Sequence, residues 1–249
     1  MIATTQGHLL NGRVRYAQPA QGFRSGIEPV LLAASIPALA GQRVLEGGTG
    51  AGAGLLCLLT RVPGVSGVGI ELDPGYADMA RANAAANGLN RHADDGPTAM
   101  TVMTGDISIV QPDGVFDHAF ANPPYHPAAG TASPNAVRAR AKQAPADLLI
   151  FWAAALARPL RARGTLTFIL PAASLAGCLD AMAAAGCSAA AILPLWPKAE
   201  TQAKLMIVRG VKGGRGKLRL LPGLVLHEAG GRFTPAADAI LRGVEPLNY

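Results

Sequence analysis

Short apolar runs alternate along the chain with longer segments in which apolar residues recur at helical spacing. Runs rich in Val, Ile, Leu and Phe predict strands, and apolar residues three or four positions apart predict helices. The expected strands are residues 42–46, 65–73, 99–106, 114–121, 165–171, 187–195, 204–211 and 217–226. The expected helices are residues 27–39, 55–61, 74–88, 147–164 and 174–186.

The order of these elements indicates the fold class. Strands that alternate with helices favour an α/β fold with a doubly wound, mostly parallel sheet and helices on both faces. The Asn11-Gly12 pair between two short apolar stretches predicts a β-hairpin near the start of the chain. We find no internal repeat and no clear linker. We therefore expect a single domain over residues 1–249, with a hairpin and cap in 1–26 and the core in 27–249.

Glycines and polar side chains stand where four successive predicted strands end. The first strand runs into the pattern E-x-G-x-G-x-G, which consists of Glu46, Gly48, Gly50 and Gly52. Glycines in such a turn let backbone N–H groups approach a ligand at a helix start. The next three strands end at Glu71, Asp106 and Asn122. Ligands of doubly wound sheets bind beyond the carboxyl ends of the strands, so these residues predict one binding site.

Each of these signals is weak when it is taken singly. Glycine-rich turns also occur in dinucleotide-binding proteins and in ordinary tight turns, and single acidic residues are common at strand ends. The prediction of a binding site therefore depends on the combination of the glycine pattern with polar residues at four successive strand ends. An acid such as Glu71 can accept hydrogen bonds from both ribose hydroxyls, and one such as Asp106 can hold an adenine amino group.

The segment FANPPY, residues 120–125, places two prolines directly after the fourth of these strands. Proline fixes φ and has no backbone donor, so it makes a rigid corner. Together with the glycine pattern, Glu71 and Asp106, the NPPY motif resembles the class I S-adenosylmethionine-dependent methyltransferases that act on exocyclic or amide nitrogens.

This resemblance implies a Rossmann-like sheet of seven strands, with S-adenosyl-L-methionine as cofactor and no metal. The glycine turn would face the methionine part of the cofactor, Glu71 the ribose and Asp106 the adenine, with Leu72 and Ile107 beside them. Most members of the family have Asp where this chain has Glu46, which keeps the charge and moves it by one methylene.

The expected catalytic residues form the NPPY corner: Asn122, Pro123, Pro124 and Tyr125. A nitrogen conjugated to a ring or a carbonyl is a poor nucleophile. If the Asn122 oxygen and the Pro123 carbonyl accept its N–H bonds, its lone pair turns toward the methyl group. Catalysis would then rest mainly on orientation and on acceptor dipoles, with Tyr125 stacked on the planar target.

Three acceptor classes share NPPY: adenine in nucleic acid, guanine in ribosomal RNA, and the glutamine amide of release factors. Residues 22–34, 193–213 and 222–243 resemble segments of the bacterial valine-tRNA adenine N6-methyltransferases. That resemblance implies a tRNA adenine as acceptor, and it places Arg24, Ser25 and Gly26 over the cofactor. His126 follows NPPY where the family often has an aromatic residue. A protein glutamine N5-methyltransferase, an rRNA guanine N2-methyltransferase and a non-catalytic RNA-binding module remain alternatives.

Charge is spread unevenly along the chain. Residues 1–125 hold 7 basic and 10 acidic residues, a net charge of −3, whereas residues 126–249 hold 15 and 6, a net charge of +9. A basic half suggests an anionic partner, nucleic acid first. The substrate-binding candidates are His126, Arg138, Arg140, Lys142 and Lys198. Lys198 belongs to a second basic group in residues 198–219, for which a solvated edge strand is an equal alternative.

The sequence gives no sign of a membrane protein, a secreted protein or a cysteine-ligated metal site. No apolar run is long enough to span a membrane, and the N-terminus lacks the pattern of a signal peptide. The three cysteines, Cys57, Cys178 and Cys187, have no metal-ligand spacing and indicate reduced thiols in the core. We therefore expect a cytoplasmic protein, either a monomer or a homodimer.

Overall fold

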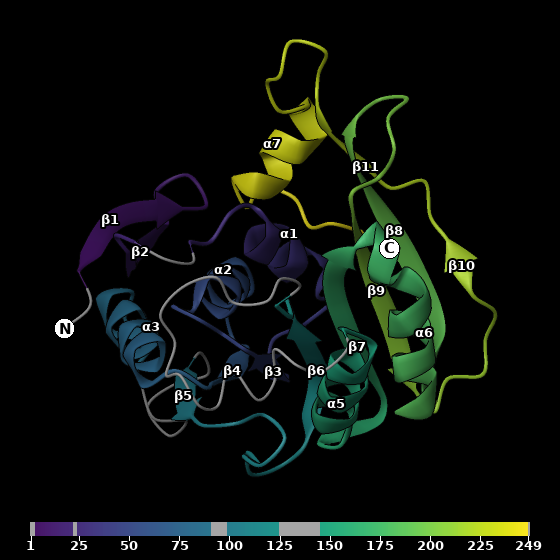
Figure 1. Cartoon of the computed structure of the whole chain (residues 1–249). Helices are drawn as coiled ribbons and strands as arrows, with labels where there is room; N and C mark the ends of the chain where they lie inside the picture. The colour runs from purple at the N-terminus through teal and green to yellow at the C-terminus, as the bar shows by residue number, and fades with distance from the viewer. Residues whose placement is uncertain (1–2, 22–23, 91–98, 125–144, 249) are drawn as a thin grey trace.

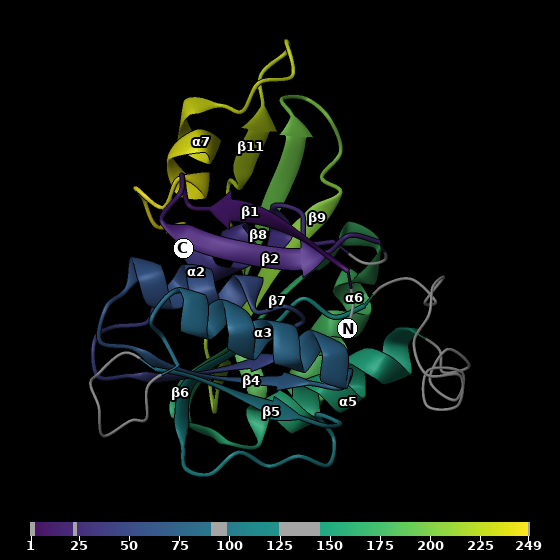
Figure 2. The same cartoon turned by 90° about the vertical axis from the view of Figure 1, so that its left-hand side faces the viewer.

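A computed structural model describes residues 3–21, 24–90, 99–124 and 145–248. The chain opens with an antiparallel hairpin of β1 (Thr4–Leu9) and β2 (Val14–Pro19), as predicted. Asn11 and Gly12 in its turn have positive φ values of 55° and 89°, a conformation that Asn and Gly adopt most readily. The hairpin lies across α2 and α3 (Figure 2), to which β2 is packed.

One sheet forms the centre of the molecule. Its strands are β3 (Arg43–Gly47), β4 (Ser66–Glu71), β5 (Met100–Thr104), β6 (Phe116–Ala121), β7 (Leu160–Pro171), β8 (Cys187–Lys198) and β9 (Leu205–Lys212), with the short β10 (Arg219–Leu220) and β11 (Leu224–His227). The described strands follow the order β10-β8-β9-β7-β6-β3-β4-β5, with β11 also paired to β8. Among these strands, only β9 runs antiparallel to both of its neighbours. The predicted doubly wound, mostly parallel sheet is confirmed. Strands β10 and β11 replace the single strand expected over residues 217–226, and they extend the seven strands that the resemblance implies.

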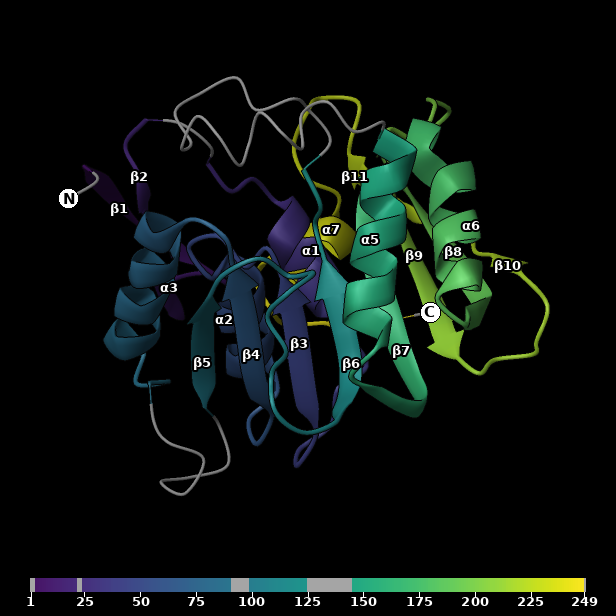
Figure 3. The same ribbon diagram turned by 60° about the horizontal axis from the view of Figure 1, so that its bottom comes forward.

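Helices cover both faces of this sheet (Figures 1 and 3). One face carries α1 (Glu28–Ser35), α2 (Ala53–Arg61), α3 (Pro74–Ala86) and α7 (Pro235–Leu241), whose apolar residues share one core with the hairpin. The other carries α5 (Pro145–Ala157) and α6 (Leu175–Ala184), which form a second core. Leu149, Trp152 and Leu156 of α5 are buried there.

Prolines end two helices earlier than the apolar spacing predicted. Helix α1 stops at Ser35, because Ile36 before Pro37 is extended, and Leu39 is 67% exposed rather than part of the helix. Helix α5 stops at Ala157, because Pro159 cannot continue it, and the residues from Leu160 onward form β7 instead. Helix α7 was not predicted at all.

The register of the sheet shows how far β8 extends. Phe120 of β6 lies level with Thr167, Arg209 and Ala191 on the successive strands β7, β9 and β8. From Ala191, β8 continues to Lys198, which is about 20 Å of extended chain beyond that level. There it pairs with β11, so the two strands rise past the edge at which β3, β4 and β6 end.

The three cysteines are free and buried, in agreement with the prediction of core thiols. No helix in the described ranges is long and apolar enough to cross a membrane.

Candidate active site

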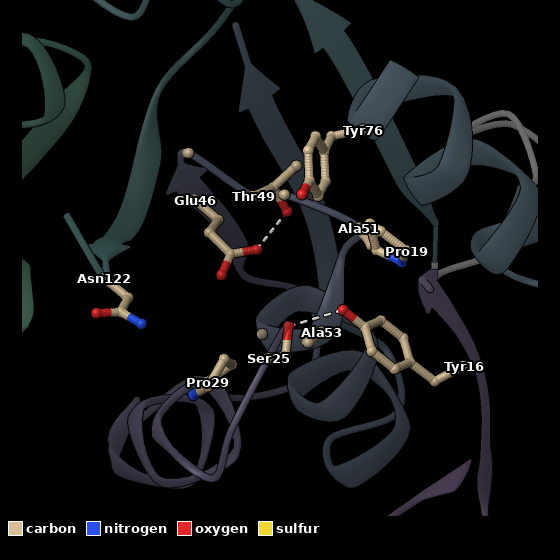
Figure 4. Close-up of a pocket in the computed structure, with 13 residues that line it drawn as sticks. Tyr16, Pro19, Ser25, Pro29, Glu46, Thr49, Ala51, Ala53, Tyr76 and Asn122 are labelled. Atoms are coloured by element: carbon tan, nitrogen blue, oxygen red, sulfur yellow. Dashed lines mark hydrogen bonds between the residues drawn. The ribbon is translucent and has the colours of Figure 1, made fainter. Parts of the chain in front are cut away.

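A pocket opens at the carboxyl ends of β3 and β6, beside the hairpin (Figure 4). Five parts of the chain line it: the hairpin, the segment leading into α1 with its first turn, the end of β3 with the glycine-rich turn and the start of α2, the first turn of α3, and the residue after β6. Its lining residues are Tyr16, Pro19, Ser25, Pro29, Glu46, Gly48, Thr49, Gly50, Ala51, Ala53, Gly54, Tyr76 and Asn122. The place agrees with the rule that ligands bind beyond the carboxyl ends of the strands.

The glycine-rich turn between β3 and α2 needs its glycines. Gly48, Gly50 and Gly52 have φ values of 62°, 56° and 93°, which side chains other than glycine rarely adopt. A Cβ on Gly48 would collide with the Trp152 ring, whereas one on Gly50 would meet nothing within 4 Å. The turn is therefore packed against α5 at Gly48 and has open space beside Gly50.

Glu46 is buried at the floor of the pocket, and its side chain folds back onto its own turn. Its Oε2 accepts hydrogen bonds from the Thr49 hydroxyl at 2.5 Å and from the Leu55 backbone N–H at 3.2 Å. Leu55 belongs to the first turn of α2, whose N-cap residue Gly52 has no capping side chain, so Glu46 takes over that role. Burial raises the pKa of the Glu46 carboxyl to about 8 against these hydrogen bonds, and the charge of Glu71 adds to the rise.

Glu71 lies at the tip of β4, next to the glycine turn but not in the pocket lining. Its Oε2 accepts from the Gly50 N–H at 2.8 Å, and its Oε1 accepts from the Asp73 N–H at 2.9 Å. Burial raises the pKa of this carboxyl as well. Leu72 beside it is 39% exposed. The carboxyl groups of Glu46 and Glu71 thus hold the same turn, Glu46 at Thr49 and Leu55 and Glu71 at Gly50.

Asp106 lies outside the lining residues of the pocket, one strand farther along the sheet, after β5. Its Oδ1 accepts hydrogen bonds from the Ser108 backbone N–H and hydroxyl, at 2.9 and 2.7 Å. Ile107 is buried in the second core. It packs so closely on Gly47, at the end of β3, that a Cβ added to Gly47 would collide with it.

Asn122 points into the pocket directly after β6 (Figure 4). Its amide makes no hydrogen bond with any residue that the structure describes. Pro123 is buried and Pro124 is exposed, so the corner is held on one side and open on the other. Tyr125, His126, Arg138, Arg140 and Lys142 lie outside the described residues.

The segment before α1 contributes Ser25 to the pocket. The Ser25 hydroxyl is 2.8 Å from the Tyr16 hydroxyl, and its backbone N–H donates to Gln18 Oε1 at 3.1 Å. Arg24 and Gly26 on either side are exposed and are not among the lining residues.

Several lining residues were missed at the sequence level. Tyr16, Tyr76 and Thr49 carry hydroxyls around the pocket, but they come from the hairpin, the first turn of α3 and the glycine turn. Thr49 was detectable, because it stands inside the E-x-G-x-G-x-G pattern. Nothing in the local sequence near Tyr16 indicates that the hairpin folds against the strand ends.

The basic group of residues 198–219 is divided between two edges of the sheet. Lys198 lies at the end of β8 on the pocket edge, where its Nζ donates to the Ala229 carbonyl at 3.0 Å. Lys212 lies at the opposite edge, and its Nζ donates to the Ala157 and Leu160 carbonyls at 2.7 and 2.8 Å. Arg209 donates to the Ser35 carbonyl. Lys212 and Arg209 therefore bind backbone carbonyls of the chain itself.

The pocket has the features that S-adenosylmethionine needs. Glu46 Oε1 receives no hydrogen bond from the described residues and can accept one from an ammonium group. The turn at Gly50 leaves room beside it, and the Tyr16 and Ser25 hydroxyls can bind a carboxylate. Among the described residues, no three His, Cys, Asp or Glu side chains come together as metal ligands would.

Two release factor glutamine methyltransferases are similar to this chain over part of its length. The protein from Rhodospirillum rubrum is 41% identical over 93 residues, which are 37% of this chain and 26% of that relative. The protein from Bradyrhizobium diazoefficiens is 38% identical over 88 residues, 35% of this chain and 27% of that relative. The chain thus spans about a quarter of the length of these relatives. No protein-family model matches it.

Solved structures resemble the chain over most of its length. A predicted O-methyltransferase from Agrobacterium tumefaciens has a TM-score of 0.72 at 22% identity and covers 89% of this chain and 99% of its own. A methyltransferase from Pyrococcus furiosus has a TM-score of 0.57 at 16% identity, over 81% of this chain and 90% of its own. The chain therefore has the fold of the class I S-adenosylmethionine-dependent methyltransferases, as predicted.

Proposed function

We propose that this chain is an S-adenosylmethionine-dependent N-methyltransferase. The observation that carries the proposal is Asn122, a pocket-lining amide without a partner among the described residues, placed between β6 and two prolines. It shares the pocket with Glu46 and the glycine-rich turn. An amide acceptor at a rigid corner beside a cofactor pocket suits a reaction in which the target nitrogen must be oriented.

The chemistry follows from what Asn122 and Pro123 offer. When bound, S-adenosylmethionine supplies an electrophilic methyl group. The Asn122 side-chain oxygen and the Pro123 carbonyl would accept the N–H bonds of the target, which turns its lone pair out of conjugation. Orientation supplies most of the rate, and the two acceptor dipoles stabilise the positive charge that develops on nitrogen. Pro124 would keep the corner rigid, and Tyr125 would stack on the planar acceptor.

The remaining roles concern the cofactor. Glu46 and the turn at Gly48, Gly50 and Gly52 would hold its methionine part. Glu71 would bind the ribose and Asp106 the adenine, with Leu72 and Ile107 beside the ring and Arg24, Ser25 and Gly26 over the cofactor. Glu71 can still accept the ribose hydroxyls, because its bonds from Gly50 and Asp73 occupy only part of the acceptor capacity of a carboxylate.

We rank the glutamine amide of a release factor first among the acceptors. Support comes from the two relatives that are named release factor glutamine methyltransferases, at 41% and 38% identity. An amide nitrogen is planar and conjugated, as the Asn122 corner requires. The similarity covers about a quarter of those relatives, so the rest of their chains gives no support for this acceptor.

The N6 of an adenine in tRNA is the second candidate, and the charge distribution favours it. Residues 126–249 carry a net charge of +9, and Arg138, Arg140 and Lys142 follow NPPY closely in the sequence. Basic side chains beside a catalytic corner would bind phosphates and position an unstacked base. His126 and Lys198 would belong to the same substrate surface.

Transfer of labelled methyl groups tests the proposal. The purified protein would be incubated with labelled S-adenosylmethionine and, separately, release-factor protein, unmodified bulk tRNA and ribosomal RNA. We expect label in a glutamine of the release factor. Asn122→Ala should lower transfer by about 100-fold, because orientation is lost, while cofactor affinity stays unchanged. Asn90→Ala, an exposed amide on the surface, is the matched control.

The acceptor that takes up label decides between the candidates. Label in N6-methyladenosine from tRNA would favour the second candidate, and label in guanosine would favour ribosomal RNA. Label in any acceptor that Asn122→Ala leaves intact would contradict the role of Asn122. Cofactor binding without transfer to any of the three would favour a non-catalytic RNA-binding module.

A further inference from the structure

The pocket lining can be grouped into three sides around the glycine turn: the side toward β4, the side toward β6, and a third wall made by the hairpin and the start of α1. The sulfonium of S-adenosylmethionine has three branches. This inference therefore rests on the proposed function. Strands β4 and β6 flank β3 on its two sides, so Glu71 and Asn122 lie on opposite sides of the glycine turn. If the adenosyl branch lies toward Glu71 and the methyl toward Asn122, the amino-acid branch is left with the third wall. That wall is formed by the hairpin, the segment before α1 and the first turn of α1: Tyr16, Pro19, Ser25 and Pro29.

Two hydroxyls are the hydrogen-bonding side chains of this third wall. The Tyr16 and Ser25 oxygens lie 2.8 Å apart, and Figure 4 shows both at the pocket. Tyr16 is 3% exposed, and burial raises the pKa of its phenol to about 12, so it keeps its proton. The pair holds two protons and uses one for its own bond. The other is left to donate to a carboxylate.

Strand β2 fixes Ser25 at two points. Tyr16 binds the Ser25 hydroxyl, and Gln18, two residues along the same strand, accepts the Ser25 backbone N–H. Alternate residues of a strand share a face, so both contacts come from the inner face of the hairpin. We propose that Tyr16 is a positioning residue that directs the Ser25 hydroxyl to the amino-acid branch of S-adenosylmethionine, and that the hairpin thereby recognises this end of the cofactor.

Two ligands that differ in the amino-acid branch test this proposal by calorimetry. S-adenosylhomocysteine carries the branch, and 5′-methylthioadenosine lacks it. We expect Tyr16→Phe to weaken S-adenosylhomocysteine binding about tenfold, the effect of one hydrogen bond to a charged group, and to leave 5′-methylthioadenosine unchanged. Asn87→Ala is the control for a loosened hairpin, because Asn87 binds the Arg15 backbone away from the pocket. It should not change the ratio of the two affinities.

A double mutant separates positioning from an independent contact. If Tyr16 acts through Ser25, Tyr16→Phe should add little to the loss caused by Ser25→Ala, because contacting residues are not additive. Additive losses would overturn the positioning role. An equal loss for both ligands in Tyr16→Phe would show a structural role only. If the wild-type protein binds neither ligand, the proposed cofactor itself is wrong, which is a different outcome from binding that Tyr16→Phe leaves unchanged.

Discussion

At the scale of single residues, Glu46 illustrates how burial prepares a side chain for a charged ligand. Its carboxyl is buried beside Glu71, and its raised pKa of about 8 keeps it protonated at neutral pH. A bound cofactor brings an ammonium group and a sulfonium, which favour the ionised form. Binding should therefore release a proton as long as the pH is below about 8.

From this we predict that S-adenosylmethionine binding tightens as the pH rises from 6 to 8 and levels off above. The slope should approach tenfold per pH unit, the limit for release of one proton, with Glu71 adding to it if that carboxyl also ionises. Calorimetry at several pH values measures it. Glu46→Gln should remove most of the dependence, and an equally steep profile in that variant would contradict the role of Glu46.

His118 of β6 links the free energy of unfolding, rather than cofactor binding, to pH. Burial lowers the pKa of its imidazole to about 4, although Asp117 acts against this shift. Its ring nitrogens bind the Thr165 hydroxyl and Gln42 Oε1. Between pH 4 and 6.5 the unfolded chain takes up a proton that the folded protein does not, so the free energy of unfolding falls as the pH falls.

The size of this effect can be predicted. When the pH is lowered from 7 to 4.5, the free energy of unfolding of the wild-type protein should fall by about 2 kcal/mol more than that of His118→Gln. The reason is that one unit of pKa shift is worth about 1.4 kcal/mol. Urea unfolding of both proteins at both pH values measures the difference. Comparing the two proteins cancels the contribution of Glu46, which has the opposite sign. An identical loss in both would show that His118 is not responsible.

At the scale of elements, the hairpin and the glycine-rich turn are joined by Asn83 of α3. Its buried amide binds the N–H and carbonyl of Ala17 in β2 at 2.9 and 2.8 Å, and its Nδ2 also donates to the Ala51 carbonyl at 2.9 Å. Asn87, one helical turn later, binds both backbone groups of Arg15. Helix α3 thus holds β2 much as a neighbouring strand would.

We predict that Asn83→Ala destabilises the protein by about 2–3 kcal/mol, because it leaves buried backbone groups unsatisfied. It should also weaken cofactor binding, since Ala51 belongs to the glycine turn. Asn87→Ala loses similar bonds at a half-exposed position and should cost less, without affecting the cofactor. Urea unfolding and calorimetry test both variants. If Asn83→Ala and Asn87→Ala lost the same cofactor affinity, the loss would come from weaker docking of the hairpin and not from the contact between Asn83 and Ala51.

The same elements show what the sequence could predict. Strand ends and the glycine turn were predictable, because buried strands and helix starts leave local patterns. The end of α1 before Pro37 and of α5 before Pro159 followed from proline chemistry, but apolar spacing obscured both. Helix α7 begins at Thr234-Pro235, a helix-start signal that was overlooked. Tyr16 was out of reach, since its role depends on how the hairpin docks on α3.

At the scale of the whole molecule, basic residues of the C-terminal half lie at two opposite edges of the sheet, and only one of these edges is near the pocket. Lys198 ends β8 and Lys204 precedes β9, so both lie on the pocket edge. Arg215 follows the end of β9 on the opposite edge, with Lys217 two residues later. Charge near the pocket can act on an acceptor that the pocket receives, whereas charge at the far edge cannot contact the same phosphates at short range.

This division gives a prediction that separates the two acceptor candidates. If the acceptor is tRNA, replacing Lys198 and Lys204 by Ala should weaken its binding. The slope of log K against log salt should also become shallower, by about 0.7–0.9 for each phosphate that the protein no longer neutralises. Replacing Arg215 and Lys217 by Ala, the matched change at the opposite edge, should alter neither quantity. Titrations at several salt concentrations measure both variants. Equal effects of the two double variants would indicate non-specific attraction to a basic protein, and leave the release-factor glutamine as the better-supported acceptor.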